Sequence, residues 1–160
     1  MHPPRLDDAT VLARLAELEL ALPAVSTPAG AYRPVVIRGR QGSVAAQFPI
    51  LDGKPVWTGR VGEHLTEEQG VQAARLAGLN VLAQLHAHLG GFERLDGLLH
   101  VDGHVASAED FQRQPQVLDG ASNLFRAVLG DAGTHTRAAF APRHMPWDLA
   151  VQLVVTFALR

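Results

Sequence analysis

The segment from Ala150 to Leu159 constrains the fold most strongly, because large apolar side chains occupy every second position. Successive side chains of a β-strand point to opposite faces, so a period of two predicts a strand with one strongly apolar face. That face carries Val151, Leu153, Val155, Phe157 and Leu159. The other face carries Gln152, Val154 and Thr156. The rest of the chain must therefore supply a layer that covers one face of a sheet.

Other segments have the character of strands. From Leu98 to Ala106 the pattern again has a period of two, with one apolar side and one polar side. The apolar side is predicted to carry Leu99, Val101 and Val105, and the polar side His100, Asp102 and His104. Shorter strands are predicted over Val35–Arg38, Ser43–Phe48 and Arg137–Ala141. The pair Asp52 and Gly53 is typical of a tight hairpin turn.

Three helices are predicted. The clearest begins after Thr66, whose hydroxyl can cap the helix while Gln69 reaches back to close a capping box. Its apolar face comprises Val71, Ala74, Gly78, Leu82, Leu85 and Leu89, and Gly90 and Gly91 end it. A second helix is predicted from Pro115 to Leu129, with Leu118, Ala121, Phe125 and Leu129 as its apolar stripe. A short opening helix is predicted from Asp8 to Leu22, with Leu12, Leu15, Leu18 and Leu22 on one stripe.

This order of elements predicts an α+β fold in which two helices cover one face of a mixed sheet. Residues 1–22 are expected to form an N-terminal helical appendage, and residues 23–160 one globular domain. The segment from Pro23 to Gly30 is the expected linker between them. The face of the sheet that carries Gln152 and the histidine row is too polar for a core and too apolar for simple solvation. We therefore expect it to be buried in an oligomer.

Composition excludes several classes of protein. Lys and Arg total 14 against 16 Asp and Glu, a net charge of −2, so no positive field is present to hold nucleic acid. The absence of cysteine excludes disulfides, thiolate catalysis and iron–sulfur clusters. No apolar run is long enough to cross a membrane, and the first residues lack the pattern of a signal peptide. A cytoplasmic protein without membrane or nucleic-acid partners is expected.

Motifs for common cofactors and nucleophiles are also missing. No glycine-rich phosphate loop occurs, and none of the serines lies in a Gly-x-Ser-x-Gly elbow, so no cofactor is predicted. His86 and His88 lie two residues apart on a helix and are interpreted as surface residues. Alternate strand positions place His100, Asp102 and His104 on one side, where they could form a metal site or a hydrogen-bonded polar row at a subunit contact. The polar row is the favoured interpretation, and no metal is predicted.

Arg137 is the most informative single residue. Strand alternation places Arg137, Ala139 and Ala141 on one side, so the guanidinium rises above small side chains. A forked and permanently charged donor in such a recess suits a carboxylate, which it binds through two parallel hydrogen bonds. The alternative is that Arg137 pairs with an Asp or Glu at a subunit contact.

A series of short motifs, in the same order along the chain, resembles the YjgF/RidA family, formerly labelled endoribonuclease L-PSP. The similarity covers about residues 23–158 and is greatest to the longer branch with a chorismate-mutase-like fold, whose members also carry an additional N-terminal helix. The motifs are Pro28-Ala29-Gly30-Ala31-Tyr32, Val44-Ala45-Ala46-Gln47-Phe48-Pro49, the helix with Ala73, Leu79 and Asn80, Val105-Ala106-Ser107-Ala108-Glu109-Asp110-Phe111, Asp119-Gly120-Ala121-Ser122, and Thr136-Arg137-Ala138-Ala139.

The resemblance implies a homotrimer with small-molecule clefts between its subunits. In the deaminase branch, the arginine that matches Arg137 holds the carboxylate of an enamine or imine, and water releases ammonia and a 2-keto acid. Tyr32 and the backbone near Ala139 match positions that shape the cleft. An RNA-cleaving function, also assigned to some relatives, fits poorly with the net charge of −2.

Three departures from the family pattern affect the implied site. Ala45 stands where the family has a serine before Gln47, and Asp119 stands where asparagine is common. Gln152 replaces the glutamate that positions the attacking water, and an amide cannot accept a proton at neutral pH. Two hypotheses follow: a trimer that binds a small carboxylate metabolite and deaminates an imine, and a non-catalytic binding or interaction module. For the first, Arg137 and Gln152 are the catalytic candidates. The ligand-binding candidates are Tyr32, Ala45, Gln47, Asp119, Arg137 and Ala139.

Overall fold

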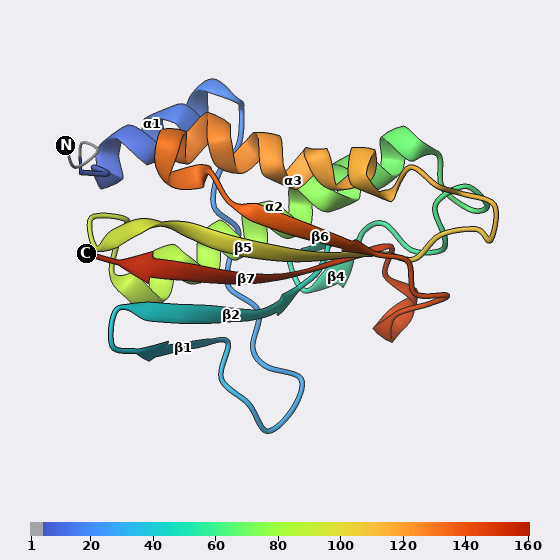
Figure 1. Ribbon diagram of the computed structural model, residues 1–160, viewed down its shortest axis with the longest axis horizontal. Helices are drawn as coiled ribbons and strands as arrows, with labels where there is room; N and C mark the ends of the chain where they lie inside the picture. Colours follow the sequence, from blue (N-terminus) through green and yellow to red (C-terminus); the bar gives the residue numbers. More distant parts are fainter. Residues whose placement is uncertain (1–4) are drawn as a thin grey trace.

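A five-stranded mixed sheet forms the centre of the protein in a computed structural model that describes residues 5–160. The strands are β1 (Val35–Arg38), β2 (Gln41–Gln47), β5 (Leu95–Val105), β6 (Thr136–Phe140) and β7 (Val151–Leu159), in the order β1-β2-β7-β5-β6. Only β5 and β6 run parallel, and the other neighbours are antiparallel. The predicted α+β class and mixed sheet are confirmed (Figure 1).

The alternation along β7 has the predicted result. Every second residue from Val151 to Leu159 is buried on the helix-covered face, and the residues between them are only partly buried. Strand β5 departs from the predicted pattern near its start, because the pairing with β7 shifts register between Leu98 and His100. This irregularity turns Leu98 into the core and leaves Leu99 39% exposed, so the prediction that Leu99 faces the core is wrong.

Helices α2 (Glu67–Leu89) and α3 (Gln114–Leu129) lie side by side on one face of the sheet (Figure 1). The capping box at Thr66 is present, with both reciprocal hydrogen bonds to Gln69, and Gly90 ends α2 with a left-handed backbone. The two helices approach closely at Gly120, where a Cβ atom would lie 2.2 Å from the carbonyl oxygen of Val71. The prediction of two sheet-covering helices is confirmed.

More of α2 is buried than the predicted apolar stripe. Every residue from Ala77 to Leu85 is buried, including Asn80 and Gln84. The cause is the chain between α1 and β1, which runs past α2 on its way to the loop at the bottom of Figure 1. Leu20 and Leu22 pack against the core from this segment. Asn80 instead binds the segment that follows β2, because its amide donates to the carbonyls of Phe48 and Ile50 at 2.8 Å each.

The opening helix is shorter than predicted. Helix α1 spans Asp8–Glu17, and the extension to Leu22 is wrong, because Glu19 adopts a positive φ of 57° that ends the helix. Its buried side chains are Val11 and Leu15, while Leu12 and Leu18 are more than one third exposed. Val11 and Leu15 belong to the same hydrophobic core as the sheet and the other two helices.

The remaining elements are short. Asp52 and Gly53, both with positive φ, connect β3 (Ile50–Leu51) to β4 (Lys54–Pro55), which confirms the predicted hairpin turn. Two 3₁₀ turns, η1 (Gly130–Gly133) and η2 (Pro146–Asp148), precede β6 and β7. Within residues 5–160, no helix is both long and apolar enough to cross a membrane.

Candidate functional site

Arg137 emerges at the edge of the sheet, against helix α3. It pairs with Val101 in the β5–β6 ladder, so its side chain points to the helix-covered face. Its Nη1 donates to Asp119 Oδ1 and to Ser122 Oγ, both at 2.9 Å, and its Nη2 donates to the carbonyl of Pro115 at 3.0 Å. The Arg137 side chain is 21% exposed, and these three hydrogen bonds hold its guanidinium against α3. The structure brings Asp119 and Arg137 together as an ion pair within one chain.

A hydrogen-bonded pair of side chains supports Arg137. His135 Nδ1 lies 2.7 Å from the carbonyl oxygen of Gly133, so this nitrogen carries the proton. Its Nε2 is then an acceptor for the hydroxyl of Ser122 at 2.9 Å. Burial lowers the pKa of His135 below its ordinary value, and the positive charge of Arg137 lowers it further. A neutral imidazole thus orients the hydroxyl that accepts from Arg137.

Only part of this cluster follows from the sequence. The motifs that resemble the family contain Asp119, Ser122 and Arg137, whereas His135 lies in none of them. A usable signal was present, because Asp119 and Ser122 are three residues apart on a predicted helix and so share a face. The open hollow next to Arg137 is lined by Ser122, Arg126, Thr134, His135 and Arg137.

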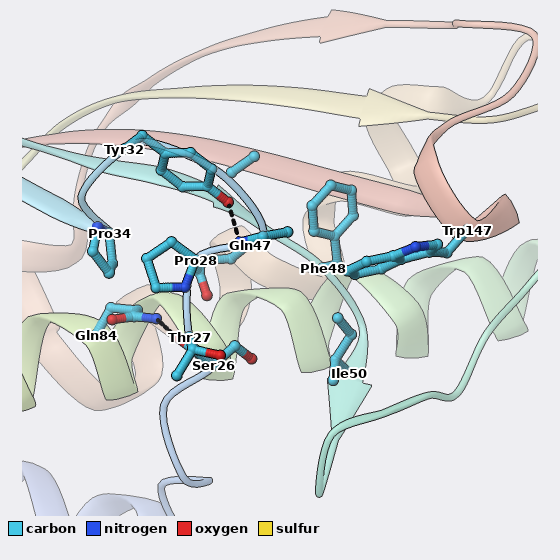
Figure 2. A pocket seen from close by; sticks show the side chains of 12 residues that line it. Ser26, Thr27, Pro28, Tyr32, Pro34, Gln47, Phe48, Ile50, Gln84 and Trp147 are labelled. Carbon is cyan, nitrogen blue, oxygen red and sulfur yellow. Dashed lines mark hydrogen bonds between the residues drawn. The ribbon is translucent and has the colours of Figure 1, made fainter.

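Tyr32 and Gln47 lie together at a second place, on the β2 side of the sheet (Figure 2). They line a pocket of about 470 Å³, including its open mouth. Tyr32 is 52% exposed, and its hydroxyl accepts from the backbone nitrogen of Ala29 at 3.3 Å. Gln47 is buried, and its amide donates to the carbonyl of Ala45 at 3.0 Å across an irregularity in β2.

Two further residues of this pocket were not predicted as site residues. Gln84 enters from α2, and Trp147 enters from η2 with its side chain beside Phe48 (Figure 2). Gln84 falls outside the predicted apolar stripe of its helix, and Trp147 lies in a loop without a recognisable motif. Only the folded chain brings residues 26–34, 46–50, 84 and 147 together.

The two groups of candidate residues do not meet within one chain. Tyr32, Ala45 and Gln47 lie at β2, whereas Arg137 and Ala139 lie on β6. Three strand spacings separate β2 from β6, which is about 14 Å. Gln152 lies on β7 between them, on the face that no helix covers, directly opposite His104 of β5.

The histidine row occupies this uncovered face. His100 Nε2 lies 3.1 Å from Asp102 Oδ1, and His100 Nδ1 lies 2.7 Å from Thr136 Oγ1. His104 instead stacks on Phe140, with ring centroids 4.8 Å apart. Among residues 5–160, no group of three or more His, Asp or Glu side chains is placed to hold a metal ion. The three side chains therefore form a polar row in which two members are hydrogen-bonded.

Both helical histidines lie at the surface, as predicted, but they differ in their contacts. His88 is exposed, but His86 is half-buried, because α1 packs beside it. Its Nε2 lies 3.2 Å from Asp8 Oδ1, and its ring contacts that of Phe92. His86 thus connects α2 to the start of α1.

Comparison with known proteins identifies the family. Residues 12–159 match the family model described as "YjgF/chorismate_mutase-like, putative endoribonuclease". The chain belongs to this YjgF family. The resemblance inferred from the short motifs is therefore confirmed, as is the chorismate-mutase-like fold.

Relatives of this YjgF-family chain match over almost their whole length. Protein TCP17 of Trypanosoma cruzi is 35% identical over 144 residues, which are 89% of this chain and 90% of that protein. A structure described as a putative endoribonuclease from Shewanella oneidensis is 33% identical, with a TM-score of 0.91 over 94% of this chain and 99% of that one. Atu1372 of Agrobacterium tumefaciens, described as of unknown function, is 34% identical, with a TM-score of 0.89 over 96% of both chains.

A more distant structure shares the fold alone. Escherichia coli TdcF, whose structure is described with bound serine, is 18% identical, with a TM-score of 0.60 over 87% of this chain and 94% of that one.

Proposed function

We propose that this YjgF-family protein assembles as a homotrimer and binds a small carboxylate metabolite in clefts between its subunits. The observation that carries the proposal is the separation of the candidate residues into two groups on different strands. A cleft that uses both groups needs a second copy of the chain, because the intervening strands β7 and β5 keep them apart within one copy. A cyclic assembly of identical chains supplies such clefts by symmetry.

The uncovered face of the sheet supports self-association. Val36, Leu99 and Phe140 are each more than one third exposed, while Val154 and the polar row beside it are half-buried. These apolar side chains lie among polar ones on a face that one copy leaves open, and packing against a second copy would remove them from water. The sheet face therefore provides the contact, and its edges provide the two sides of each cleft.

The ion pair between Arg137 and Asp119 supports a carboxylate as the ligand group. In one copy the guanidinium already binds one carboxylate oxygen at 2.9 Å, in an orientation fixed by Ser122. A ligand carboxylate makes the same charge-assisted hydrogen bonds and competes with Asp119 for them. Asp119 is exposed and can turn away when the ligand binds.

The candidate reaction is hydrolysis of a 2-imino acid. Water adds to the imine carbon, the nitrogen takes up a proton, and ammonia leaves as the 2-keto acid forms. The amide of Gln152 can orient that water, and His104, directly opposite, is the nearest side chain in the ladder that can accept its proton. The Nδ1 atom of His104 is buried and has no hydrogen-bond partner among the described residues.

A second candidate is a binding module without catalytic activity. The observation that favours it is Gln152, since an amide orients water without accepting its proton. The two candidates share the cleft and the role of Arg137 and differ only in turnover.

The deciding experiment supplies purified protein with an enamine generated in situ from serine or threonine by a dehydratase, and follows the release of keto acid. Acceleration over buffer that is lost in Arg137→Ala, with the trimer intact, supports the deaminase. The matched control is Arg75→Ala, because Arg75 lies on α2 and lines neither the pocket at Tyr32 nor the hollow at Arg137. No acceleration by the unmodified protein removes the deaminase and leaves the binding module.

Asp119→Asn tests the carboxylate proposal independently of turnover. Removing the competing charge should tighten binding of a carboxylate ligand to Arg137 by about tenfold, since charge-assisted pairs contribute roughly 1.5–3 kcal/mol. Serine is the first probe, because it is bound in the TdcF structure, and titration calorimetry is the measurement. Asp110→Asn, another exposed carboxylate, should leave affinity unchanged. Weaker binding by Asp119→Asn contradicts the proposed competition.

A further inference from the structure

We propose that Ser122 is an activated nucleophile, that His135 is its general base, and that together they hydrolyse a small ester that carries an acidic group. The acyl group passes through the oxygen of Ser122. All residues of this site belong to one chain, so the inference depends neither on the proposed trimer nor on imine hydrolysis.

The contact between Ser122 and His135 provides the first observation. The hydroxyl of Ser122 donates to Nε2 of His135 at 2.9 Å, and Nδ1 of His135 donates to the carbonyl of Gly133 at 2.7 Å. A nucleophile within hydrogen-bond reach of a base, with a third group that orients the base, is the arrangement that activates serine in covalent catalysis. No elbow motif is needed here, because the serine comes from the middle of α3 and the base from the segment before β6.

The packing of α3 against that segment holds the pair in place. Gly133 is buried, and a Cβ atom at this position would overlap the carbonyl oxygen of Phe125. Only glycine allows such a close approach of the two backbones. The ring of His135 also meets the ring of Phe125 edge-on, with centroids 5.8 Å apart. The imidazole is therefore fixed against the helix that carries Ser122.

The surroundings of His135 keep its imidazole free to accept a proton. Burial lowers its pKa below the ordinary value, and the positive charges of Arg137, His100 and Arg126 lower that pKa further. The hydrogen bond to Gly133 acts in the opposite direction but does not outweigh them. At neutral pH, Nε2 is therefore unprotonated and can take the proton of the serine hydroxyl.

Arg137 provides the second observation. Its Nη1 donates to the oxygen of Ser122 at 2.9 Å, while Asp119 and the carbonyl of Pro115 accept from the same guanidinium. A fixed positive charge beside a hydroxyl favours the loss of its proton. The same charge stabilises the negative charge that develops on a carbonyl oxygen under attack by the serine. Ser122 thus contacts both a proton acceptor and a positive charge.

The hollow beside these residues provides the third observation and defines the substrate. It has a volume of about 780 Å³, including its open mouth, and it is lined by Ser122, Arg126, Thr134, His135 and Arg137. Ser122 and His135 are partly exposed, so a ligand in the hollow contacts both side chains. Two of the lining residues are arginines and none is acidic, which favours a substrate with an acidic group. That group pairs with Arg126, because Arg137 is occupied by Asp119 and Ser122.

The reaction has two steps. The oxygen of Ser122 attacks the ester carbonyl, its proton passes to Nε2 of His135, and the alcohol leaves with that proton as the bond between the acyl carbon and the alcohol oxygen breaks. Water then attacks the acyl-serine and gives one proton to Nε2, and the acid is released as Ser122 regains that proton. One ester and one water molecule become an alcohol and a carboxylic acid, without any other reactant.

Para-acetoxybenzoate is the test substrate, because it is an acetyl ester whose leaving group carries a carboxylate. Absorbance follows its hydrolysis, which the unmodified protein should accelerate over buffer. Ser122→Ala should reduce the rate to that of buffer, and His135→Asn should lower the acceleration by about 100-fold or abolish it, because the general base is lost. His144→Asn is the matched control and should keep the full rate, since His144 is exposed and does not line the hollow.

The methyl ester of the same compound tests the role of Arg126, because it lacks the negative charge of the acid. Rates for both compounds are divided by their rates in buffer. Arg126→Gln should reduce the preference for the acid by about fivefold, as the loss of an exposed ion pair predicts. Arg75→Gln, on α2, should keep that preference. An unchanged preference in Arg126→Gln contradicts the assigned substrate class.

Ser122→Cys distinguishes an activated position from a structural serine, because the chain contains no cysteine of its own. The rate of alkylation by iodoacetamide at a series of pH values gives the pKa of the new thiol. Beside Arg137 and His135, that pKa should lie well below the ordinary value of about 8.5, and adding His135→Asn should raise it again. Ser43→Cys, at an exposed position, should titrate near the ordinary value.

Three results would overturn the inference: no acceleration over buffer by the unmodified protein, an unchanged rate in Ser122→Ala, or an ordinary or raised thiol pKa in Ser122→Cys. Circular dichroism verifies that each variant is folded. The thiol measurement needs no turnover, so it detects a merely structural role of Ser122. The carboxylate proposal at Arg137 is measured with a different probe, and it stands or falls separately.

Discussion

At the scale of single residues, the candidate site depends on how protons are distributed around Arg137. The carbonyl of Gly133 fixes the proton of His135 on Nδ1, which leaves Nε2 to accept from Ser122. Ser122 then presents its lone pairs to Arg137. A second proton on His135 would turn Nε2 into a donor and place two positive charges side by side. The orientation of Arg137 therefore depends on His135 remaining neutral.

This arrangement predicts a loss of stability in mild acid that His135 controls. Because burial lowers the pKa of His135 below its ordinary 6.5, the unfolded chain binds the proton more tightly than the folded protein does. The free energy of unfolding should therefore fall as the pH drops below about 6.5 and through the lowered pKa of the folded state. Urea unfolding at a series of pH values measures this.

A matched pair of variants isolates the contribution of His135. His135→Asn should flatten the fall of stability in that pH range, whereas His144→Asn should not, because His144 is exposed. If His135→Asn keeps the full pH dependence of the unmodified protein, another group causes it. Arg137 would then be held independently of the charge on His135.

At the scale of elements, α2 determines where both groups of candidate residues lie. It packs against the sheet and α3, and it carries Asn80 and Gln84, which hold the segments leading into β1 and out of β2. The capping box at Thr66 fixes the start of this helix. The start of α2 is therefore a point where local sequence supports the whole fold.

Thr66→Ala should lower the free energy of unfolding by about 1 kcal/mol, because the backbone N–H of Gln69 loses the Thr66 hydroxyl that accepts its hydrogen bond. Urea denaturation followed by circular dichroism measures the change. Gln72→Ala, at an exposed position within the helix, should alter stability by less than about 0.5 kcal/mol. Equal effects of the two substitutions would show that the cap contributes nothing specific.

At the scale of the whole molecule, one face of the sheet is covered by helices and the other is open. Val154 lies in the middle of the open face, on the strand between β2 and β5. If this face joins the subunits, a charge at its centre cannot be accommodated without a partner. The monomer itself tolerates that charge, since the position borders on solvent in one copy.

Val154→Glu, which lies directly opposite Asp102 and repels it, should therefore convert the proposed trimer into a folded monomer that no longer binds the carboxylate ligand. Light scattering coupled to size exclusion measures the mass, and circular dichroism confirms that the fold persists. Gln72→Glu, at an exposed position of α2, should leave the proposed assembly intact. A monomeric unmodified protein at all concentrations would contradict the proposed assembly.

Local patterns determined the elements of this protein. Alternation specified the buried face of β7, the spacing of Thr66 and Gln69 specified the start of α2, and Asp52 with Gly53 specified a turn, because each depends on a few neighbouring residues. The same reasoning failed where distant contacts decide. The irregular pairing of β5 places Leu99 on the exposed side of the strand and not on the predicted core side. The backbone turn at Glu19 ends α1 before the predicted end at Leu22.

The candidate site likewise has one part that the sequence predicted and another that only the fold decided. Arg137, Asp119, Tyr32 and Gln47 could be named from short motifs, although their roles stay predictions. Tertiary structure alone decided that Arg137 pairs with Asp119 and that Gln84 and Trp147 share a pocket with Tyr32. The physical reason is that a strand or helix reports its own periodicity, whereas a site is made by segments far apart in sequence, and no local pattern records which of them meet.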